Sequence, residues 1–157
     1  MKLSKNNPMA KEKIIILEKE NYLAVIKNSV DSRMFQNVYA LVNSKKTDLT
    51  KKGNLSCALY VSSILKVFDL IKNIHLTVDS TIENMKKSGW QEVKLSKIKP
   101  GDIIVWAEKN NHQHIGFFIG NKKAVSNNSK TKKIANHHFT FNGQRKIEKI
   151  LTHKLLK

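Results

Sequence analysis

Hydrophobic residues in the first half of the chain recur three or four positions apart, which is the spacing of a helix. Over residues 22–42 this pattern predicts one helix. The polar segment 44–54 then interrupts the pattern and predicts a loop. A second helix is expected over 56–71, with the side chain of Ser56 as its N-terminal cap. The first half of the chain is therefore expected to be helical.

Beyond Trp90 the pattern changes from helical spacing to short β-type runs. A third helix over 78–88, with Gly89 as its stop signal, precedes this change. The runs that follow are bounded by Gly, Asn, Pro or Lys clusters and predict strands at 91–95, 102–108, 114–120, 122–126, 138–141 and 145–151. Helices followed by an antiparallel meander indicate the α+β class.

The length of 157 residues fits one compact domain. We expect a basic leader over 1–20 and a single domain over 21–157. The apolar run at 14–17 is too short for a signal segment or a membrane span, so the chain as it stands is expected to be soluble and monomeric. The expected location is cytoplasmic in this form, or the cell wall or extracellular space if another route exports it.

Basic residues greatly outnumber acidic ones: 29 Lys and Arg against 12 Asp and Glu give a net charge of +17. From Lys109 onward, 11 basic residues accompany one acid, Glu148. Such a surface attracts polyanions such as nucleic acid, anionic lipid or an acidic cell-wall polymer. Only Arg33 and Arg145 are arginines, which indicates general attraction rather than sequence-specific DNA reading. Coding bias toward lysine explains the same charge equally well.

Cys57 is the only cysteine and stands at the predicted start of the second helix. The backbone N–H groups and the dipole at a helix start favour a thiolate, and the same N–H groups can hold an oxyanion. We therefore expect Cys57 to be more thiolate-like than a free cysteine. For an isolated cysteine, a small buried core residue is the alternative interpretation.

The segment HIGFFIGN, residues 114–121, opens a predicted strand with a histidine. A histidine at a strand edge next to Gly116 has open space on one face, although taken alone it is more often structural or exposed. A single cysteine followed by His114 is the order that a Cys–His pair needs, with the thiol on a helix tip and the imidazole on the sheet behind it.

Three segments together resemble the NlpC/P60 superfamily of papain-like cysteine peptidases, including its CHAP-like amidase relatives. They are SCALYVSSIL at 56–65, KPGDIIVW at 99–106 and HIGFFIGN at 114–121. In that family a helix begins with the nucleophilic cysteine, a PGD strand follows, and a strand that starts with the catalytic histidine comes next. The resemblance covers about 54–152 and implies N-terminal helices packed on an antiparallel sheet. Ser56 departs from it, since many members have Asp there.

The resemblance implies that Cys57 is the nucleophile and His114 is the base. Family members usually carry a third polar residue, often His, about twelve positions after the catalytic histidine, and here that position is Ser126. A serine orients an imidazole poorly, whereas the amide oxygen of Asn127 or Asn128 can accept the Nδ1–H, as in Cys-His-Asn sites. The third catalytic member therefore stays open at this stage.

Further candidates lie near these segments. Trp106 is expected to line the substrate cleft, with core packing as the alternative, and Asn128 and His138 are the other expected substrate contacts. His112 is expected to be solvated in a loop before the strand. The sequence has no H-E-x-x-H motif and no second cysteine, so we expect no metal site and no cofactor.

The leading hypothesis is a cysteine hydrolase that cleaves an amide bond, in a peptidoglycan stem peptide or another peptide, through Cys57 and His114. The expected partners are that substrate and a polyanion at the basic surface. Two alternatives remain. One is a non-catalytic basic module that binds an anionic wall or nucleic acid, and the other is a thiol acyltransferase with the same Cys–His pair.

Overall fold

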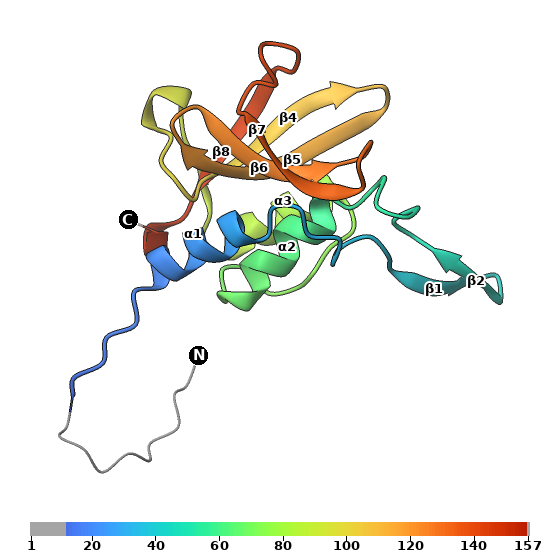
Figure 1. The fold of residues 1–157 in the computed structure, drawn as a ribbon, viewed down its shortest axis with the longest axis horizontal. Coiled ribbons are helices and arrows are strands. Elements are labelled where there is room, and N and C mark those ends of the chain that lie inside the picture. The colour runs from blue at the N-terminus through green and yellow to red at the C-terminus, as the bar shows by residue number, and fades with distance from the viewer. Residues whose placement is uncertain (1–11, 157) are drawn as a thin grey trace.

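The computed structural model describes residues 12–156 and has three helices beside a curled antiparallel sheet (Figure 1). The helices are α1 (Glu18–Asn28), α2 (Cys57–Val67) and α3 (Val78–Lys87). The strands are β1 (Tyr39–Val42), β2 (Lys45–Asp48), β3 (Gln91–Glu92), β4 (Ile103–Lys109), β5 (His112–Gly120), β6 (Lys123–Asn128), β7 (Lys133–His138) and β8 (Ile147–Thr152). Short 3-10 turns span Leu95–Lys97 and Lys154–Leu156. The α+β prediction is confirmed.

The main sheet has six antiparallel strands in the order β3-β8-β4-β5-β6-β7. From β4 to β7 the strands follow the predicted meander, while β8 returns to pair with β4 on its other side. No helix of residues 12–156 is long and apolar enough to cross a membrane. The meander places β5 at the centre of the sheet, where both of its edges are occupied.

The principal core lies between α2 and one face of the sheet. Helix α2 is apolar on nearly all sides and packs against β5 and β6. Its residues Tyr60, Val61 and Leu65 are completely buried, as are Ile115 and Phe117 on the facing side of β5. Tyr60 and Phe117 meet edge to face, with ring centroids 5.3 Å apart. This packing holds the first turn of α2 against the middle of the sheet.

A smaller apolar cluster lies on the other face of the sheet, around Ile104, Trp106, Phe118 and Ala124. Alternation along the strands explains the division, because successive side chains point to opposite faces. On β5, Ile115 and Phe117 face the helices, so His114 and Gly116 face the smaller cluster.

The predicted long helix over 22–42 is wrong beyond Asn28. Asp31 adopts a left-handed conformation with φ of 67°, and its N–H donates to the carbonyl of Ile134 on β7. The chain thereby leaves the helix to pair with the sheet edge. Beyond it, β1 and β2 form a hairpin whose turn, Asn43 and Ser44, has positive φ at both residues. Figure 1 shows this hairpin projecting away from the rest of the molecule.

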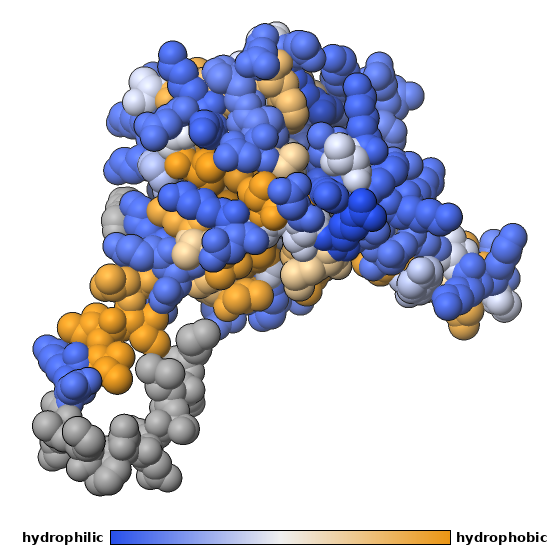
Figure 2. Space-filling model, in the orientation of Figure 1, coloured by the Kyte–Doolittle hydropathy of each residue, from blue (hydrophilic) through white to orange (hydrophobic). Residues whose placement is uncertain are grey.

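One further expectation needs correction. The predicted strand at 138–141 is displaced, since β7 ends at His138 and Phe141 lies in a turn with φ of 51°. The leader over 1–20 stays a prediction, because residues 1–11 lie outside the described part of the chain; α1 begins at Glu18. Figure 2 shows apolar side chains gathered where the exposed residues 14–17 precede α1.

The third helix is confirmed, with Gly89 in a left-handed conformation after it.

Candidate active site

The sulfur of Cys57 lies in the first turn of α2. Its own backbone N–H, that of Ala58 and that of Ile115 on β5 lie close enough to Sγ to lower the pKa of the thiol. Ser56 occupies the N-cap position as predicted, but its side chain makes no capping bond and its buried hydroxyl finds no partner within 12–156. The expected side-chain cap is therefore wrong, and the first-turn N–H groups of α2 donate no capping bond to Ser56.

Burial determines the ionisation of Cys57. Desolvation raises the pKa of the thiol, while the three N–H groups and the positive charge of Arg145 lower the pKa by less. The predicted thiolate-like cysteine is therefore wrong for the resting protein. The helix start acts in the expected direction, but the enclosure of the side chain outweighs it. Cys57 rests as a neutral thiol, so a base has to take its proton when it attacks.

His114 is the third residue of β5, because that strand begins at His112 rather than after it. It stands opposite Trp106 in the β4–β5 register. The next residue on the same face is Gly116, where an added Cβ would lie only 2.7 Å from the Cβ of Ser126. The missing side chain at Gly116 therefore lets Ser126 on β6 approach the imidazole of His114.

Three hydrogen bonds run from His114 across the neighbouring strands. Nε2 of His114 lies 2.8 Å from Oγ of Ser126. The same Oγ lies 2.7 Å from Nε2 of His137 on β7. Nδ1 of His137 in turn lies 2.8 Å from the carbonyl oxygen of His138. The structure thus joins two imidazoles through one serine hydroxyl.

Aromatic rings enclose the two imidazoles. The ring centroid of Trp106 lies 5.3 Å from that of His114 and 5.6 Å from that of His137. Phe141 stacks on His137, with a centroid distance of 3.9 Å and an interplanar angle of 16°. Trp106 is itself fixed by its Nε1–H, which donates to the carbonyl of Phe139 at 2.7 Å. This packing holds both imidazole rings in defined orientations.

The same enclosure keeps His114 neutral. Burial, together with smaller contributions from the positive charge of Arg145 and from His137, lowers the pKa of His114 to about 3. A neutral imidazole has one bare nitrogen that can accept a proton. The resting site therefore combines a neutral thiol with a neutral imidazole rather than a preformed ion pair.

Arg145 brings a positive charge to the site, and sequence reasoning missed this role. It lies in the loop before β8, where Nη2 donates to the carbonyl of His112 at 2.6 Å and Nε to that of Ala107 at 3.4 Å. No carboxylate of residues 12–156 forms an ion pair with it. Its charge lowers the pKa of Cys57. In the sequence, the only sign of this role was that Arg145 is one of two arginines among 29 basic residues.

Two of the predicted polar candidates do not reach His114. Asn127 lies on the helix-facing side of β6, where its side-chain amide donates to the carbonyl of Gly53 at 2.8 Å. Asn128 caps the β6–β7 turn through its Oδ1, which accepts from the backbone N–H groups of Lys130 and Thr131. The prediction that an asparagine orients the imidazole is therefore wrong. Asn127 instead anchors the loop that leads to α2.

Two predicted substrate contacts also need correction. Trp106 is 0% exposed and lies beneath the imidazoles, so core packing, the alternative interpretation, describes it. The side chain of His138 accepts from the hydroxyl of Thr140 at Nδ1, and only its carbonyl joins the hydrogen bonds of the site. The sequence did not favour His137. It pairs with Ala124 in the β6–β7 register, and Ser126 lies two residues from Ala124 on the same face of β6, so His137 reaches Ser126.

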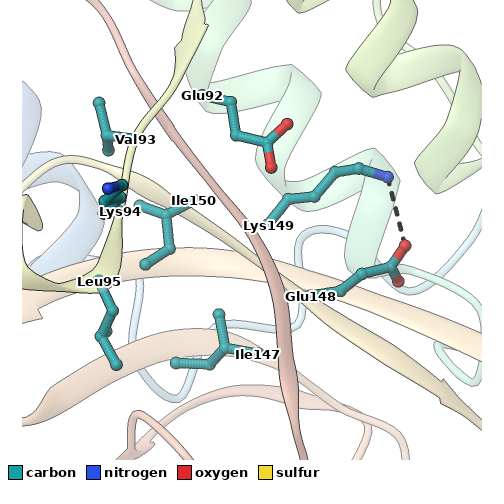
Figure 3. Close-up of a pocket in the computed structure, with 8 residues that line it drawn as sticks. All are labelled: Glu92, Val93, Lys94, Leu95, Ile147, Glu148, Lys149 and Ile150. Carbon is teal, nitrogen blue, oxygen red and sulfur yellow. Dashed lines mark hydrogen bonds and ion pairs between the residues drawn. The ribbon is translucent and has the colours of Figure 1, made fainter.

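A groove of about 450 Å³ lies elsewhere, at the edge where β3 leaves β8 (Figure 3). It is lined by Glu92, Val93, Lys94, Leu95, Ile147, Glu148, Lys149 and Ile150. Strand β4 lies between β8 and β5 in the sheet, and neither Cys57 nor His114 lines this groove. It is therefore separate from the candidate active site.

Replacing Gly116 by alanine is expected to lower the free energy of unfolding by about 1–3 kcal/mol, the usual cost of overpacking. The new Cβ would lie 2.8 Å from the carbonyl oxygen of Val125 and 3.0 Å from Cζ3 of Trp106, besides its clash with Ser126. Urea unfolding measures the loss. Gly143→Ala is the comparison, because a Cβ there meets nothing within 4 Å and costs only the strain of its φ of 81°. Equal losses in both variants would contradict the steric argument.

Comparisons with known proteins agree with this architecture. The sequence model of the NlpC/P60 family matches residues 38–149. The solved structure of NlpC2 from Trichomonas vaginalis has the same fold, with a TM-score of 0.57 and 18% sequence identity over 85% of this chain. The match covers 45% of that protein, so this chain spans less than half of its length. A search of curated proteins found no match. With most of its length matched by the family model, the chain belongs to the NlpC/P60 family.

Proposed function

We propose that the protein hydrolyses an amide bond, with Cys57 as nucleophile and His114 as general base. The observation that carries the proposal is the position of the thiol relative to the imidazole strand. The backbone N–H of Ile115 lies near Sγ of Cys57 and lowers its pKa, and Ile115 is the residue next to His114. Nε2 of His114 is occupied by Ser126, which leaves Nδ1 of the neutral ring for the thiol proton.

The reaction then follows the acyl-transfer scheme. As Sγ attacks the amide carbonyl carbon, its proton moves to Nδ1 of His114. The C–N bond breaks when the leaving nitrogen takes that proton, and a thioester remains on Cys57. A water molecule attacks the thioester, gives its proton to His114, and releases the carboxylic acid while the thiol is restored. The chemistry needs no oxidant or reductant.

The start of α2 supports oxyanion binding. The N–H groups of Cys57 and Ala58 converge near Sγ, and Ser56 does not occupy the helix start with a side-chain cap. When the carbonyl carbon becomes tetrahedral, its oxygen acquires negative charge beside these donors. Fixed backbone donors stabilise that charge without reorganisation. We propose that they form the oxyanion hole.

Peptidoglycan stem peptides are the proposed substrate class. The family supports a peptidase or amidase in general, and the net charge of +17 suits an anionic wall. The experiment is to incubate purified peptidoglycan with the protein and to identify new amino and carboxyl termini by mass spectrometry, with Cys57→Ala as the blank. Salt-sensitive binding without cleavage, equal in both proteins, would instead favour the basic binding module. Transfer of the acyl group to an added amine would favour the acyltransferase.

Removing the charge of Arg145 is expected to raise the pKa of Cys57 further. The guanidinium favours the thiolate, so Arg145→Gln should slow alkylation by iodoacetamide at pH 8 about fivefold, equivalent to roughly 1 kcal/mol of charge attraction. Arg145→Lys retains the charge and should lose less. The measurement is the alkylation rate against pH at low and high salt. Identical rate profiles in wild type and Arg145→Gln would show that Arg145 does not act on the thiol.

A further inference from the structure

We propose that His137 is a positioning residue of this site, which fixes through Ser126 the ring nitrogen of His114 that carries the proton. The inference rests on the proposed function, because it concerns the base that serves Cys57. It also addresses the departure of the third position, where a serine stands at Ser126. The structure supplies the missing imidazole one strand further away, on β7.

The direction of each hydrogen bond follows from the last acceptor in the row, which is the carbonyl oxygen of His138. The carbonyl oxygen of His138 can only accept, so Nδ1 of His137 carries a proton and donates it at 2.8 Å. His137 is buried enough that its pKa is lowered, chiefly by burial, and it rests as the neutral ring. Its Nε2 is then a bare acceptor, and the hydroxyl of Ser126 donates to it at 2.7 Å.

The serine has only one proton to give. Because that proton points at His137, Oγ of Ser126 can only accept from His114, and the 2.8 Å contact is therefore an Nε2–H donation by His114. A neutral imidazole with its proton on Nε2 has a bare Nδ1. The row of hydrogen bonds that ends at the carbonyl of His138 thus fixes the tautomer of His114. In that tautomer Nδ1 can receive a proton from Cys57.

A serine alone would not determine this tautomer. A free hydroxyl rotates, and it could equally donate to Nε2 of His114, which would place the ring proton on Nδ1 and remove the base. Wrong-tautomer histidines lose most of their catalytic effect. The stacking of Phe141 on His137 at 3.9 Å keeps the second imidazole in place, and so keeps the hydroxyl of Ser126 turned toward it.

The test compares two replacements of His137. His137→Phe preserves a flat ring against Phe141 but has no acceptor for Ser126. His137→Gln retains an amide oxygen that can accept from Ser126 and N–H groups that can reach the carbonyl of His138. His75→Gln is the control, since it changes a histidine in the loop before α3, outside the site. The readouts are the nitrogen NMR shifts of His114, which report its tautomer, and the rate of Cys57 alkylation at pH 7.

The expected result is that wild type and His75→Gln show His114 protonated on Nε2. His137→Phe should populate the Nδ1–H form and lose about tenfold or more in alkylation rate, the scale on which outer partners of a functional histidine act. His137→Gln should recover most of that rate. Thermal unfolding of each variant shows whether it is folded. If His137→Phe is not folded, the tautomer and the alkylation rate are measured in His137→Gln instead.

An Nε2–H tautomer of His114 that is unchanged in folded His137→Phe would overturn the proposal, as would an unchanged alkylation rate. This failure is distinguishable from failure of the proposed function. If Ser126→Ala still slows alkylation while His137→Phe does not, the Cys57–His114 pair stands and only the role of His137 falls. If His114→Gln leaves alkylation unchanged as well, the pair itself falls.

Discussion

Replacing Cys57 by alanine is expected to end hydrolysis while leaving the protein folded. Without Sγ no thioester can form, and the remaining backbone donors and His114 have no nucleophile to serve. We expect the rate to fall by about 10⁴-fold or more, the scale seen when a covalent nucleophile is removed. The fold should persist because the side chain is small and lies at the border of the core rather than among its fully buried residues. The measurement is product formation from the peptide fragment that wild type cleaves.

Two controls make this result specific. Ser63→Ala lies in the same helix, outside the site, and should keep full activity. Cys57→Ser retains nearly the same volume and should be almost as inactive as alanine, since a hydroxyl is a much weaker nucleophile than a thiol in this setting. Circular dichroism of all three variants checks the fold. Hydrolysis by Cys57→Ala at the wild-type rate would exclude a thioester mechanism.

Replacing His114 by glutamine is the second large expected effect. Glutamine can still donate to Ser126, but it cannot take a proton from the thiol. Because burial raises the pKa of Cys57, the thiol stays protonated near neutral pH without its base. General-base removal typically costs about 10²–10⁴-fold, and we expect a loss of that size in kcat/KM. His75→Gln is again the control for loss of an imidazole outside the site.

The pH dependence of the wild type tests the same base. Burial lowers the pKa of His114 to about 3, so the neutral ring persists as the pH falls through its ordinary value of about 6.5. Activity should therefore continue below pH 6 and disappear only as His114 becomes protonated. The measurement is kcat/KM against pH with brief acid exposure. An acid limb near 6.5 would show that His114 titrates as an ordinary imidazole and would contradict the effect of burial on its pKa.

Local sequence was a good guide where one element decides the outcome. The third helix ends where Gly89 takes its positive φ, and the apolar α2 begins where its periodicity predicted, although it ends at Val67 rather than at residue 71. The failure over 22–42 has a tertiary cause. Apolar side chains at helical spacing continued past Asn28, but the backbone of Asp31 found a partner on Ile134 of β7, about a hundred positions away. Helical propensity is a weak preference that such pairing overrides.

The ionisation of the site was likewise beyond local reasoning. The helix start that predicted a reactive thiolate at Cys57 is present, and its N–H groups act as expected. Desolvation is a property of the packed molecule, and it reverses the net shift of the pKa. The same enclosure makes His114 neutral, so the pair must exchange a proton during the reaction.

The order of segments alone determined the family, the fold class and the two residues proposed for chemistry, because each is written in contiguous motifs around Cys57 and His114. The third partner was decided only by strand register. Gly120 pairs with Lys123, and regular continuation would set Asn127 opposite Gly116, but a bulge between Phe118 and Gly120 shifts the pairing by one residue. Since one residue of slip exchanges the two faces of a strand, this shift turns Ser126 rather than Asn127 toward the imidazole, and the β6–β7 register then adds His137.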